Sequence, residues 1–428
     1  MTEAGRAALV FVESNTSGTG RLFVRIAREM GFAPVLVTAR PEKYAYLADE
    51  GAPEVIVAPT ADVDELERLL RGRFGSGAGI AGITSSSEYF IATAAALAAR
   101  FGLPGPHAAS VGAARDKSHQ RAVLAAAGLP TPVFRAVASV SDAVDAAREI
   151  GFPVVVKPVG GSGSVGVRAC AGPDEVREHA ASLFAPGDAQ ARALVESLIE
   201  GDEFSVEVFS GRVIGITRKH LGVPPYFVEA GHDYPAAVSA EAARELTETV
   251  TRATALLGLG WGPLHWELRM SGGRAYAIEV NPRLAGGFIP ELVRHAEGID
   301  LIRATLKLVV GREAEVAATR RRHASIRFLF APGAGRLDGV DGVDEARAME
   351  GVADVTLYRS VGDPLTIEGD FRDRIGHVIA CLDGFDDACD AAERARARVR
   401  VRIGGPGAAA GEEEAAAGAV VGVGEGRA

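Results

Sequence analysis

Hydrophobic and polar residues follow one another in blocks that predict a βαβ unit at the start of the chain. Apolar runs at residues 8–11 and 35–37 have the length of buried parallel strands, and residues 18–30 between them have helical spacing. The same pattern continues with a strand near 55–57, a helix near 63–70, a strand near 80–83 and an alanine-rich helix at about 89–100. Residues 1–113 are therefore expected to form a domain with a parallel sheet.

The pattern changes after a helix expected at residues 116–127, because Gly128, Pro130 and Pro132 interrupt it. The next expected elements are strands at 154–158 and 167–170 around a glycine loop, a helix at 174–184 and a strand at 193–199. This mixture of short strands and one helix predicts a small α+β lobe over residues 114–202.

A second lobe is expected over residues 203–320. Polar and apolar positions alternate over residues 204–217 around Gly211, which predicts an antiparallel hairpin. A long helix is expected at 241–257, followed by another hairpin and then by a helix at 292–310.

The last third of the chain predicts a further subdomain and a tail. Residues 321–403 contain short strands and a helix rich in Ala and Arg, and we expect them to form a C-terminal cap. Residues 404–428 are mainly Gly, Ala and Glu with few large apolar groups, so we expect this tail to be disordered. The fold class predicted for the whole chain is a multidomain combination of α/β and α+β parts.

Composition narrows the functional classes. The 428 residues are 47% hydrophobic, enough for several cores, and a net charge of −10 disfavours nucleic acid and anionic membranes as partners. Cys170, Cys381 and Cys389 have no metal-binding or paired spacing, which is typical of a reducing compartment. The apolar run at residues 7–12 is too short for a signal sequence or a membrane span, so we expect a cytoplasmic protein, with a homodimer through the alanine-rich helices as an option.

Three polar residues in the second hairpin predict a magnesium site. Glu279 and Asn281 lie two apart on one strand and so share a face, and Glu267 can join them from the partner strand. Oxygen ligands without His or Cys suit Mg²⁺ bound with phosphates. A two-residue turn at Gly272 and Gly273 alone would pair Glu267 with Ile278, so we expect a three-residue loop or a bulge that brings Glu267 opposite Glu279.

A glycine loop and two lysines predict phosphate binding. The loop contains a G-x-G-x-x-G pattern, but it leads into a strand rather than a helix, which argues against a dinucleotide site. A hairpin loop of this kind can instead fold over phosphates and offer main-chain and hydroxyl donors. Lys117 and Lys157 would offset the phosphate charge. The loop residues expected to contact the nucleotide are Gly161, Ser162, Gly163, Ser164 and Val165.

With these residues assembled, the chain resembles the ATP-grasp superfamily over about residues 5–405. The resemblance implies a Rossmann-like N-terminal domain, a two-lobed ATP-grasp fold, and ATP with Mg²⁺ as cofactors, Mn²⁺ being an alternative. It also implies that Glu267, Glu279 and Asn281 are the metal ligands. The nucleotide residues it implies are Lys117 and Lys157 for the phosphates, Glu196, Leu198 and Ile199 for adenine, and Glu203 for the ribose.

One position departs from the family pattern. Many members have Arg two residues before the first metal carboxylate, where this chain has His265. The contact to the γ-phosphate is therefore open between Arg218, Lys219 and His265.

Within the superfamily the chain looks most like the ligases that join L-amino acids, through residues 281–287 and 225–235. The resemblance implies that ATP phosphorylates a carboxylate and that an amine then attacks it, releasing ADP and phosphate. Arg283 is expected to hold the acyl phosphate and the oxyanion. Glu229 and His232, three apart in an expected loop, would bind the α-amino group or accept its proton.

Other features leave alternatives open. Gly286 and Gly287 leave the pocket beside Arg283 roomy, provided that Phe288 does not fold into it, and the turn at residues 84–88 lies where it could touch substrate. An ATP-grasp carboxylase that activates bicarbonate, an enzyme that loads an amino acid onto a carrier thiol, and a nucleotide-binding module without catalysis are the alternatives to a ligase of small-molecule carboxylates and amines.

Overall fold

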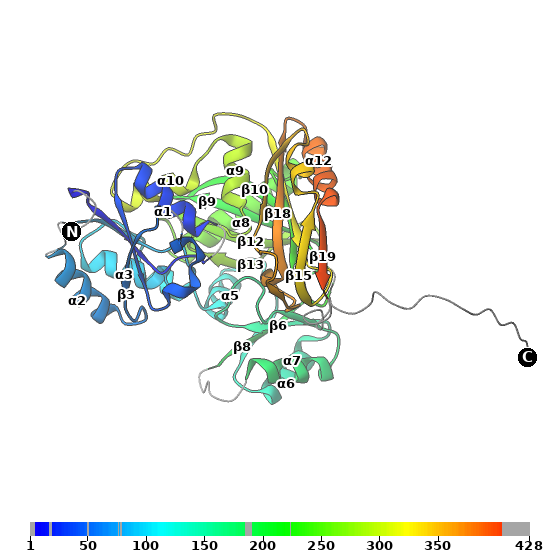
Figure 1. Cartoon of the computed structure of the whole chain (residues 1–428). Coiled ribbons are helices and arrows are strands. Elements are labelled where there is room, and N and C mark those ends of the chain that lie inside the picture. The colour runs from blue at the N-terminus through cyan, green and yellow to red at the C-terminus, as the bar shows by residue number, and fades with distance from the viewer. Residues whose placement is uncertain are drawn as a thin grey trace, which may run out of the picture.

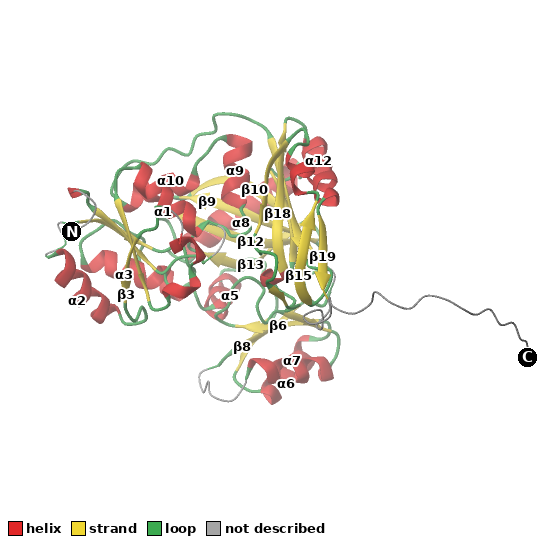
Figure 2. Cartoon of the chain, viewed as in Figure 1, coloured by secondary structure: helices red, strands yellow, loops and turns green. Residues whose placement is uncertain are grey.

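The computed structural model describes residues 5–404, apart from residues 17–18, 49–50, 76, 78, 185–190 and 223. Except for Gly404, the tail predicted to be disordered lies outside the described residues. The described strands form four sheets, and Figures 1 and 2 show the N-terminal sheet and the small lobe beside a larger body of antiparallel strands. The multidomain α/β and α+β fold class is confirmed.

The N-terminal domain is an open parallel sheet with the strand order β3-β2-β1-β4. Its strands are β1 (Ala8–Val12), β2 (Ala33–Thr38), β3 (Glu54–Val57) and β4 (Ile80–Thr84). Its helices are α1 (Gly20–Glu29), α2 (Val63–Phe74) and α3 (Ile91–Arg100). Apolar side chains of α2 and α3 cover one face and those of α1 the other, so both faces of this sheet are buried. The predicted βαβ pattern is confirmed.

The small lobe is a four-stranded antiparallel sheet with the order β5-β8-β6-β7. Its strands are β5 (Phe134–Val137), β6 (Val154–Pro158), β7 (Arg168–Cys170) and β8 (Ala193–Ser197). Its helices α6 (Val140–Ile150) and α7 (Pro173–Leu183) share one core with the sheet, and α4 (Ala108–Ala113) and α5 (Lys117–Ala126) precede the lobe. Because β6 and β7 pair antiparallel, the glycine loop between them connects a hairpin, as predicted.

An eight-stranded antiparallel sheet forms the large body, with the order β13-β12-β9-β10-β11-β14-β18-β16. Its strands are β9 (Asp202–Phe209), β10 (Arg212–Leu221), β11 (Glu229–Tyr234), β12 (Pro263–Ser271), β13 (Arg274–Asn281), β14 (His323–Phe330), β16 (Val352–Leu357) and β18 (Arg374–Leu382). Strand β11 pairs with β14, so the sheet crosses the division expected between residues 320 and 321. The C-terminal segment therefore extends the sheet of the second lobe.

The remaining elements pack around this sheet. They are the three-stranded sheet of β15 (Gly335–Asp341), β17 (Pro364–Leu365) and β19 (Arg400–Gly404), and the helices α8 (Ala240–Leu256), α9 (Ile289–Glu297), α10 (Leu301–Val309), α11 (Val343–Arg347) and α12 (Phe385–Arg398). The single helix predicted at residues 292–310 is wrong. It is divided into α9 and α10 because Gly298 ends α9 in the left-handed conformation and the Asp300 side chain caps α10.

The cysteines and the helices agree with most of the compositional expectations. All three cysteines are free; Cys170 and Cys381 are buried, and Cys389 on α12 is half-buried. In the part of the chain that the structure describes, no helix combines the length and apolar character needed to cross a membrane.

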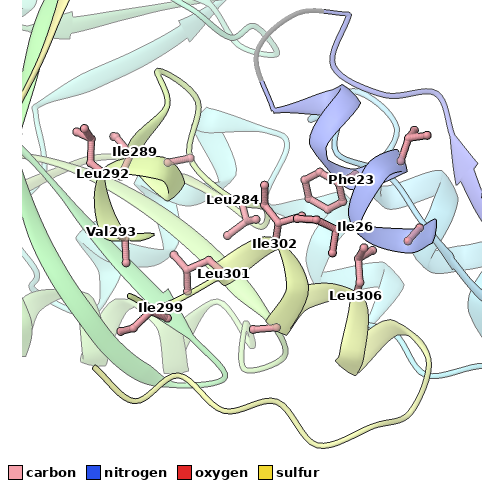
Figure 3. Packing of buried hydrophobic residues seen from close by; sticks show 14 of the residues in the cluster. Phe23, Ile26, Leu284, Ile289, Leu292, Val293, Ile299, Leu301, Ile302 and Leu306 are labelled. Carbon is pink, nitrogen blue, oxygen red and sulfur yellow. The ribbon is translucent and has the colours of Figure 1, made fainter. Parts of the chain in front are cut away.

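A shared core joins the N-terminal domain to the large body (Figure 3). Phe23 and Ile26 of α1 belong to the same buried cluster as Ile302 and Leu306 of α10. Helix α10 also lies directly on the parallel sheet, since a Cβ on Gly82 of β4 would meet atoms of α10 at 2.6 Å. The positions of the two parts therefore depend on close packing across α10.

We expect Leu306→Ala to lower the free energy of unfolding by about 2–5 kcal/mol, because it removes a fully buried side chain from this shared core. Leu256→Ala is the matched control, since Leu256 also lies in a helix but is 46% exposed, and we expect a change of less than about 1 kcal/mol. Urea unfolding followed by circular dichroism measures both. Equal shifts for the two variants would contradict the role of the shared core.

Candidate active site

The structure brings nearly all the candidate residues to one cavity between the small lobe and the large sheet. Those that line it are Lys117, Lys157, Gly161, Ser162, Gly163, Ser164, Val165, Glu196, Leu198, Ile199, Glu203, Lys219, Glu229, Glu267, Glu279, Asn281 and Arg283. His232 and His265 do not line the cavity, but each lies beside a carboxylate that does.

Alternation along β9 explains how a sheet can present charges on one face and a core on the other. Phe204, Val206 and Val208 belong to the apolar core that includes α8. Glu203 precedes Phe204, and Glu207 lies between Val206 and Val208. Both glutamates point to the opposite face, where Glu203 contacts Lys219 and Glu207 contacts His265. The polar face of this sheet is therefore the floor of the cavity.

A β-bulge in the hairpin of β12 and β13 aligns the two candidate metal carboxylates. The turn is a tight two-residue one, with Ser271 opposite Arg274, but the register shifts after Glu267 so that Glu267 lies opposite Glu279. Ile278 is the extra residue on β13. The sequence analysis expected either a three-residue loop or a bulge, and the structure has the bulge.

Lys219 of β10 neutralises part of this acidic floor. Its Nζ lies within 3.0 Å of carboxylate oxygens of Glu203, Glu229 and Glu267, and its side chain is only 2% exposed. Burial alone would lower the pKa of Lys219, but the three carboxylates raise it well above its usual value. Lys219 is therefore a permanent cation in the site.

His265 is a second cation next to the candidate metal carboxylates. Its Nδ1 lies 2.9 Å from Glu207 and its Nε2 lies 3.3 Å from Glu267. Burial lowers the pKa of His265, but the two carboxylates outweigh that effect and raise the pKa to about 9. The imidazole is therefore protonated at neutral pH, with a positive charge at the position where many family members have Arg.

The two lysines predicted to bind phosphate are buried and paired with carboxylates. Lys117 lies 3.0 Å from Glu279 and donates to the Gly161 carbonyl at 2.6 Å, and Lys157 pairs with Glu196. Burial lowers the pKa of Lys157, and the Glu196 carboxylate only partly compensates. A phosphate could replace the carboxylate partner of either lysine while the ammonium group stays buried.

The glycine loop lies over the cavity and is held from several sides. The Ser164 hydroxyl donates to the Phe227 carbonyl at 2.9 Å. A Cβ on Gly163 would meet the Phe371 ring at 2.6 Å, so the ring of the C-terminal segment lies against the loop backbone. Gly163 and Gly166 both have positive φ, which explains why glycine occurs at these positions.

Glu229 and His232 lie on strand β11, so the prediction that they occupy a loop is wrong. On a regular strand, residues three apart point their side chains to opposite sides. Here a register shift leaves Ala230 as an extra residue, which turns Glu229 and His232 to the same side. Glu229 therefore reaches both Lys219 and His232, at 2.8 Å and 3.6 Å. The strand was missed because Gly231 interrupts the apolar pattern and the pairing partner β14 is remote in sequence.

The protonation states of Glu229 and His232 argue against a role for either residue as a proton acceptor. Burial raises the pKa of Glu229, but the cations of Lys219 and Arg374 lower it well below its usual value. Burial lowers the pKa of His232 to about 3, and neither ring nitrogen has a hydrogen-bond partner among the described residues. At neutral pH the pair thus consists of a carboxylate and a neutral imidazole.

Arg283 is held by a residue of the N-terminal domain. Its Nη2 lies 2.5 Å from the carboxylate of Glu88, and its Nη1 donates to the Leu284 carbonyl at 2.8 Å. Glu88 belongs to the turn at residues 84–88, so the first domain reaches the site through a residue that contacts Arg283. Phe288 is turned away from this pocket, because it stacks on Tyr358 at 6.0 Å.

Arg218 does not belong to the site. Its side chain pairs with Asp202 at 2.9 Å near the surface, because it neighbours Lys219 on β10 and points to the opposite face. Lys219 and His265 remain the candidates for the γ-phosphate contact.

Sequence analysis missed several residues of the site. Arg269 contacts Glu203 and the Ile199 carbonyl, both at 3.0 Å, and two-residue spacing from Glu267 could have indicated it. Arg121 lies one helical turn after Lys117 and pairs with Glu196 at 3.0 Å. Nothing in the local pattern could have indicated Arg374, which contacts Glu229 from the C-terminal segment.

The residues fit a divalent cation. Glu267, Glu279 and Asn281 supply oxygen atoms on one face of a bulged hairpin. Burial is the main cause that raises the pKa of Glu279, and the neighbouring carboxylates of Glu88 and Glu267 add to that effect despite Lys117, so a bound cation would favour the ionised carboxylate. The candidate set consists of two carboxylates and one amide. Within the described ranges, no group of three or more His, Cys, Asp and Glu residues is placed to hold a metal ion.

Comparison with known proteins identifies the family. Residues 150–291 match the family described as "ATP-grasp domain", and residues 327–404 match "L-amino acid ligase C-terminal domain 2". The chain is 39% identical over 378 residues to "Uncharacterized protein y4rH" of Sinorhizobium fredii, covering 88% of this chain and 78% of that protein.

Two proteins with named activities are also similar. A D-alanine–D-alanine ligase of Pseudomonas putida is 30% identical over 219 residues, which are 48% of this chain and 66% of that enzyme. The crystal structure of an L-amino acid ligase from Bacillus licheniformis has the same fold, with a TM-score of 0.80 and 22% identity over 93% of this chain and 99% of that chain. The chain belongs to the ATP-grasp superfamily, with a C-terminal domain of the type found in L-amino acid ligases.

Proposed function

We propose that this protein is an ADP-forming ligase that joins the carboxylate of an amino acid to an amine, through an acyl phosphate. The observation that carries the proposal is the single cavity that holds the lysines, the Glu267, Glu279 and Asn281 set, and Arg283. ATP-grasp enzymes generally use ATP with a divalent ion, and the ligases named above join amino acids. A cytoplasmic location is part of the proposal.

In the first step, a carboxylate oxygen attacks the γ-phosphorus of ATP and the bond to ADP breaks. Lys117 and Lys157 offset the charge of the phosphates, and the glycine loop excludes water from above. The segment of Glu196, Leu198 and Ile199 is assigned to the adenine. A bound Mg²⁺ would neutralise charge on the transferring phosphoryl group.

In the second step, the amine nitrogen attacks the acyl carbon, the bond to phosphate breaks, and the amine loses a proton that the departing phosphate can take up. Arg283 is assigned to the oxyanion, because its planar guanidinium matches carboxylate and phosphate oxygens. Its ion pair with Glu88 orients the guanidinium at the edge of the cavity. Glu229 is assigned to the amino group of the substrate as a fixed negative charge, and not as the base, because its pKa is well below its usual value.

The test of the function is phosphate release from ATP across single L-amino acids and pairs, with mass spectrometry of the products. Hydroxylamine in place of the amine would trap an acyl phosphate as a hydroxamate. Release that requires an amino acid and yields an amide supports the ligase. Release that requires bicarbonate alone would support a carboxylase instead, and an absence of any release would favour a binding module.

We expect Glu279→Ala to abolish phosphate release while the protein stays folded, because the variant loses a metal ligand from the cavity. Glu248→Ala on the exposed side of α8 is the control, since Glu248 pairs with Arg244 at the surface. Phosphate release and thermal unfolding are measured for both variants. Turnover at the wild-type rate in Glu279→Ala would refute the metal assignment.

We expect Arg283→Lys to lower kcat by about 100-fold, because lysine keeps the charge but loses the planar fork that stabilises the oxyanion. The KM for ATP should change by less than about threefold, since the arginine acts on the acyl group. Steady-state kinetics with the best amino acid of the panel measures both constants. Arg294→Lys, at an ion pair on the surface of α9, is the control, and an unchanged kcat in Arg283→Lys would contradict this role.

A further inference from the structure

Arg374 connects the C-terminal part of the chain to the candidate site. It begins β18, and it is 145 residues away from Glu229 in sequence. Its Nη2 donates to the Glu229 side chain at 2.7 Å and to the Glu229 main-chain carbonyl at 3.0 Å. One nitrogen of the guanidinium therefore holds both the backbone and the carboxylate of the same residue.

The surroundings of Arg374 keep its guanidinium in place. The side chain is only 9% exposed, and its guanidinium carbon lies 3.7 Å from the centre of the Phe328 ring on β14. Arginine suits such a position because its planar group stacks on aromatic faces and stays charged when buried. The Nε of Arg374 is buried and has no hydrogen-bond partner in the part of the chain that the structure describes.

The contact determines what Glu229 can do. Lys219 contacts one carboxylate oxygen of Glu229 and Arg374 contacts the other, at 2.8 Å and 2.7 Å. Because both oxygens of Glu229 are held, its side chain is already ordered in the folded protein. Substrate binding therefore does not carry the entropy cost of ordering it. Glu229 therefore presents an ionised carboxylate in one orientation to the cavity that it lines.

Glu229 also lies at a suitable place for an amino acid. It shares Lys219 with Glu267, so it is separated from the metal carboxylate by a single ammonium group. An amino acid whose carboxylate is activated beside Glu267 has its ammonium group only two bonds further away. A carboxylate fixed at that distance can accept hydrogen bonds from the ammonium group, whereas a mobile one must first be ordered.

We propose that Arg374 is a positioning residue that gives the site its selectivity for carboxylates with an α-amino group, by holding Glu229 in place. This inference rests on the proposed ligase function. It makes the C-terminal segment part of the substrate site, through a residue that does not itself touch the substrate.

The test compares an amino acid with its des-amino analogue as the activated carboxylate. Hydroxamate formation from ATP and hydroxylamine is measured with L-alanine and propionate, and then with each other pair that the wild type accepts. We expect Arg374→Met to lower the ratio of kcat/KM for the amino acid over the analogue by at least about tenfold, mainly through the KM of the amino acid. The KM for ATP should stay within about twofold.

Two further variants separate positioning from general stability. Arg374→Lys keeps the charge and should restore part of the selectivity. Glu229→Gln should lose the selectivity by itself, and adding Arg374→Met to it should have little further effect, because the two residues act as a unit. Arg402→Met, at a surface ion pair with Asp341 on the same C-terminal segment, is the control and should behave as the wild type.

The outcomes distinguish this inference from the proposed function. A wild-type protein that forms no hydroxamate with any amino acid would refute the function, and the role of Arg374 with it. An active wild type with unchanged selectivity in Arg374→Met would refute only the role of Arg374, as would an equal loss with both substrates. If the Met variant does not fold, unchanged selectivity in Glu229→Gln would overturn the inference, because Arg374 acts on selectivity only through the Glu229 carboxylate that it holds.

Discussion

Lys219 is the charge on which the arrangement of the candidate site depends. Its ammonium group lies within 3.0 Å of carboxylates from three different strands, those of Glu203, Glu229 and Glu267. Buried carboxylates this close would repel one another and take up protons if the cation were absent. With it, the pKa of Glu229 and that of Glu267 lie well below the usual value for a glutamate, despite burial. The ion cluster has a cost in stability, because each buried charge must be desolvated.

The eight-stranded sheet makes the C-terminal segment part of the large body. Strands β11 and β14 are neighbours in the sheet although β11 ends at Tyr234 and β14 begins only at His323. This pairing explains how Arg374 reaches Glu229 and how the Phe371 ring reaches Gly163 of the glycine loop. In the same way, the shared core with α10 brings Glu88 of the N-terminal domain to Arg283. Residues of the N-terminal domain, the small lobe and the large sheet therefore line one cavity, and the C-terminal segment contacts two residues of its lining.

Much of this could be predicted from local patterns. The βαβ start, the hairpin loop and the shared face of the candidate metal residues follow from periodicity and spacing, since these are properties of neighbouring residues. Two-residue alternation required either a bulge near Glu267 or a three-residue loop, and the structure has the bulge. The prediction failed where an interruption was subtle, as at Gly298, which divides one expected helix into two. It also failed for β11, whose pairing partner is remote in sequence.

The sequence by itself determined the fold class, because strand alternation and turn chemistry are local, and the resemblance of its motifs to the ATP-grasp superfamily indicated most of the cavity residues. Only the tertiary structure decided which charges meet. The pKa of His265 depends on Glu207 from another strand, and the state of Glu229 depends on Lys219 and Arg374. Electrostatic interactions act through space, and burial changes their strength, so neither the partners nor the protonation can be inferred from positions along the chain.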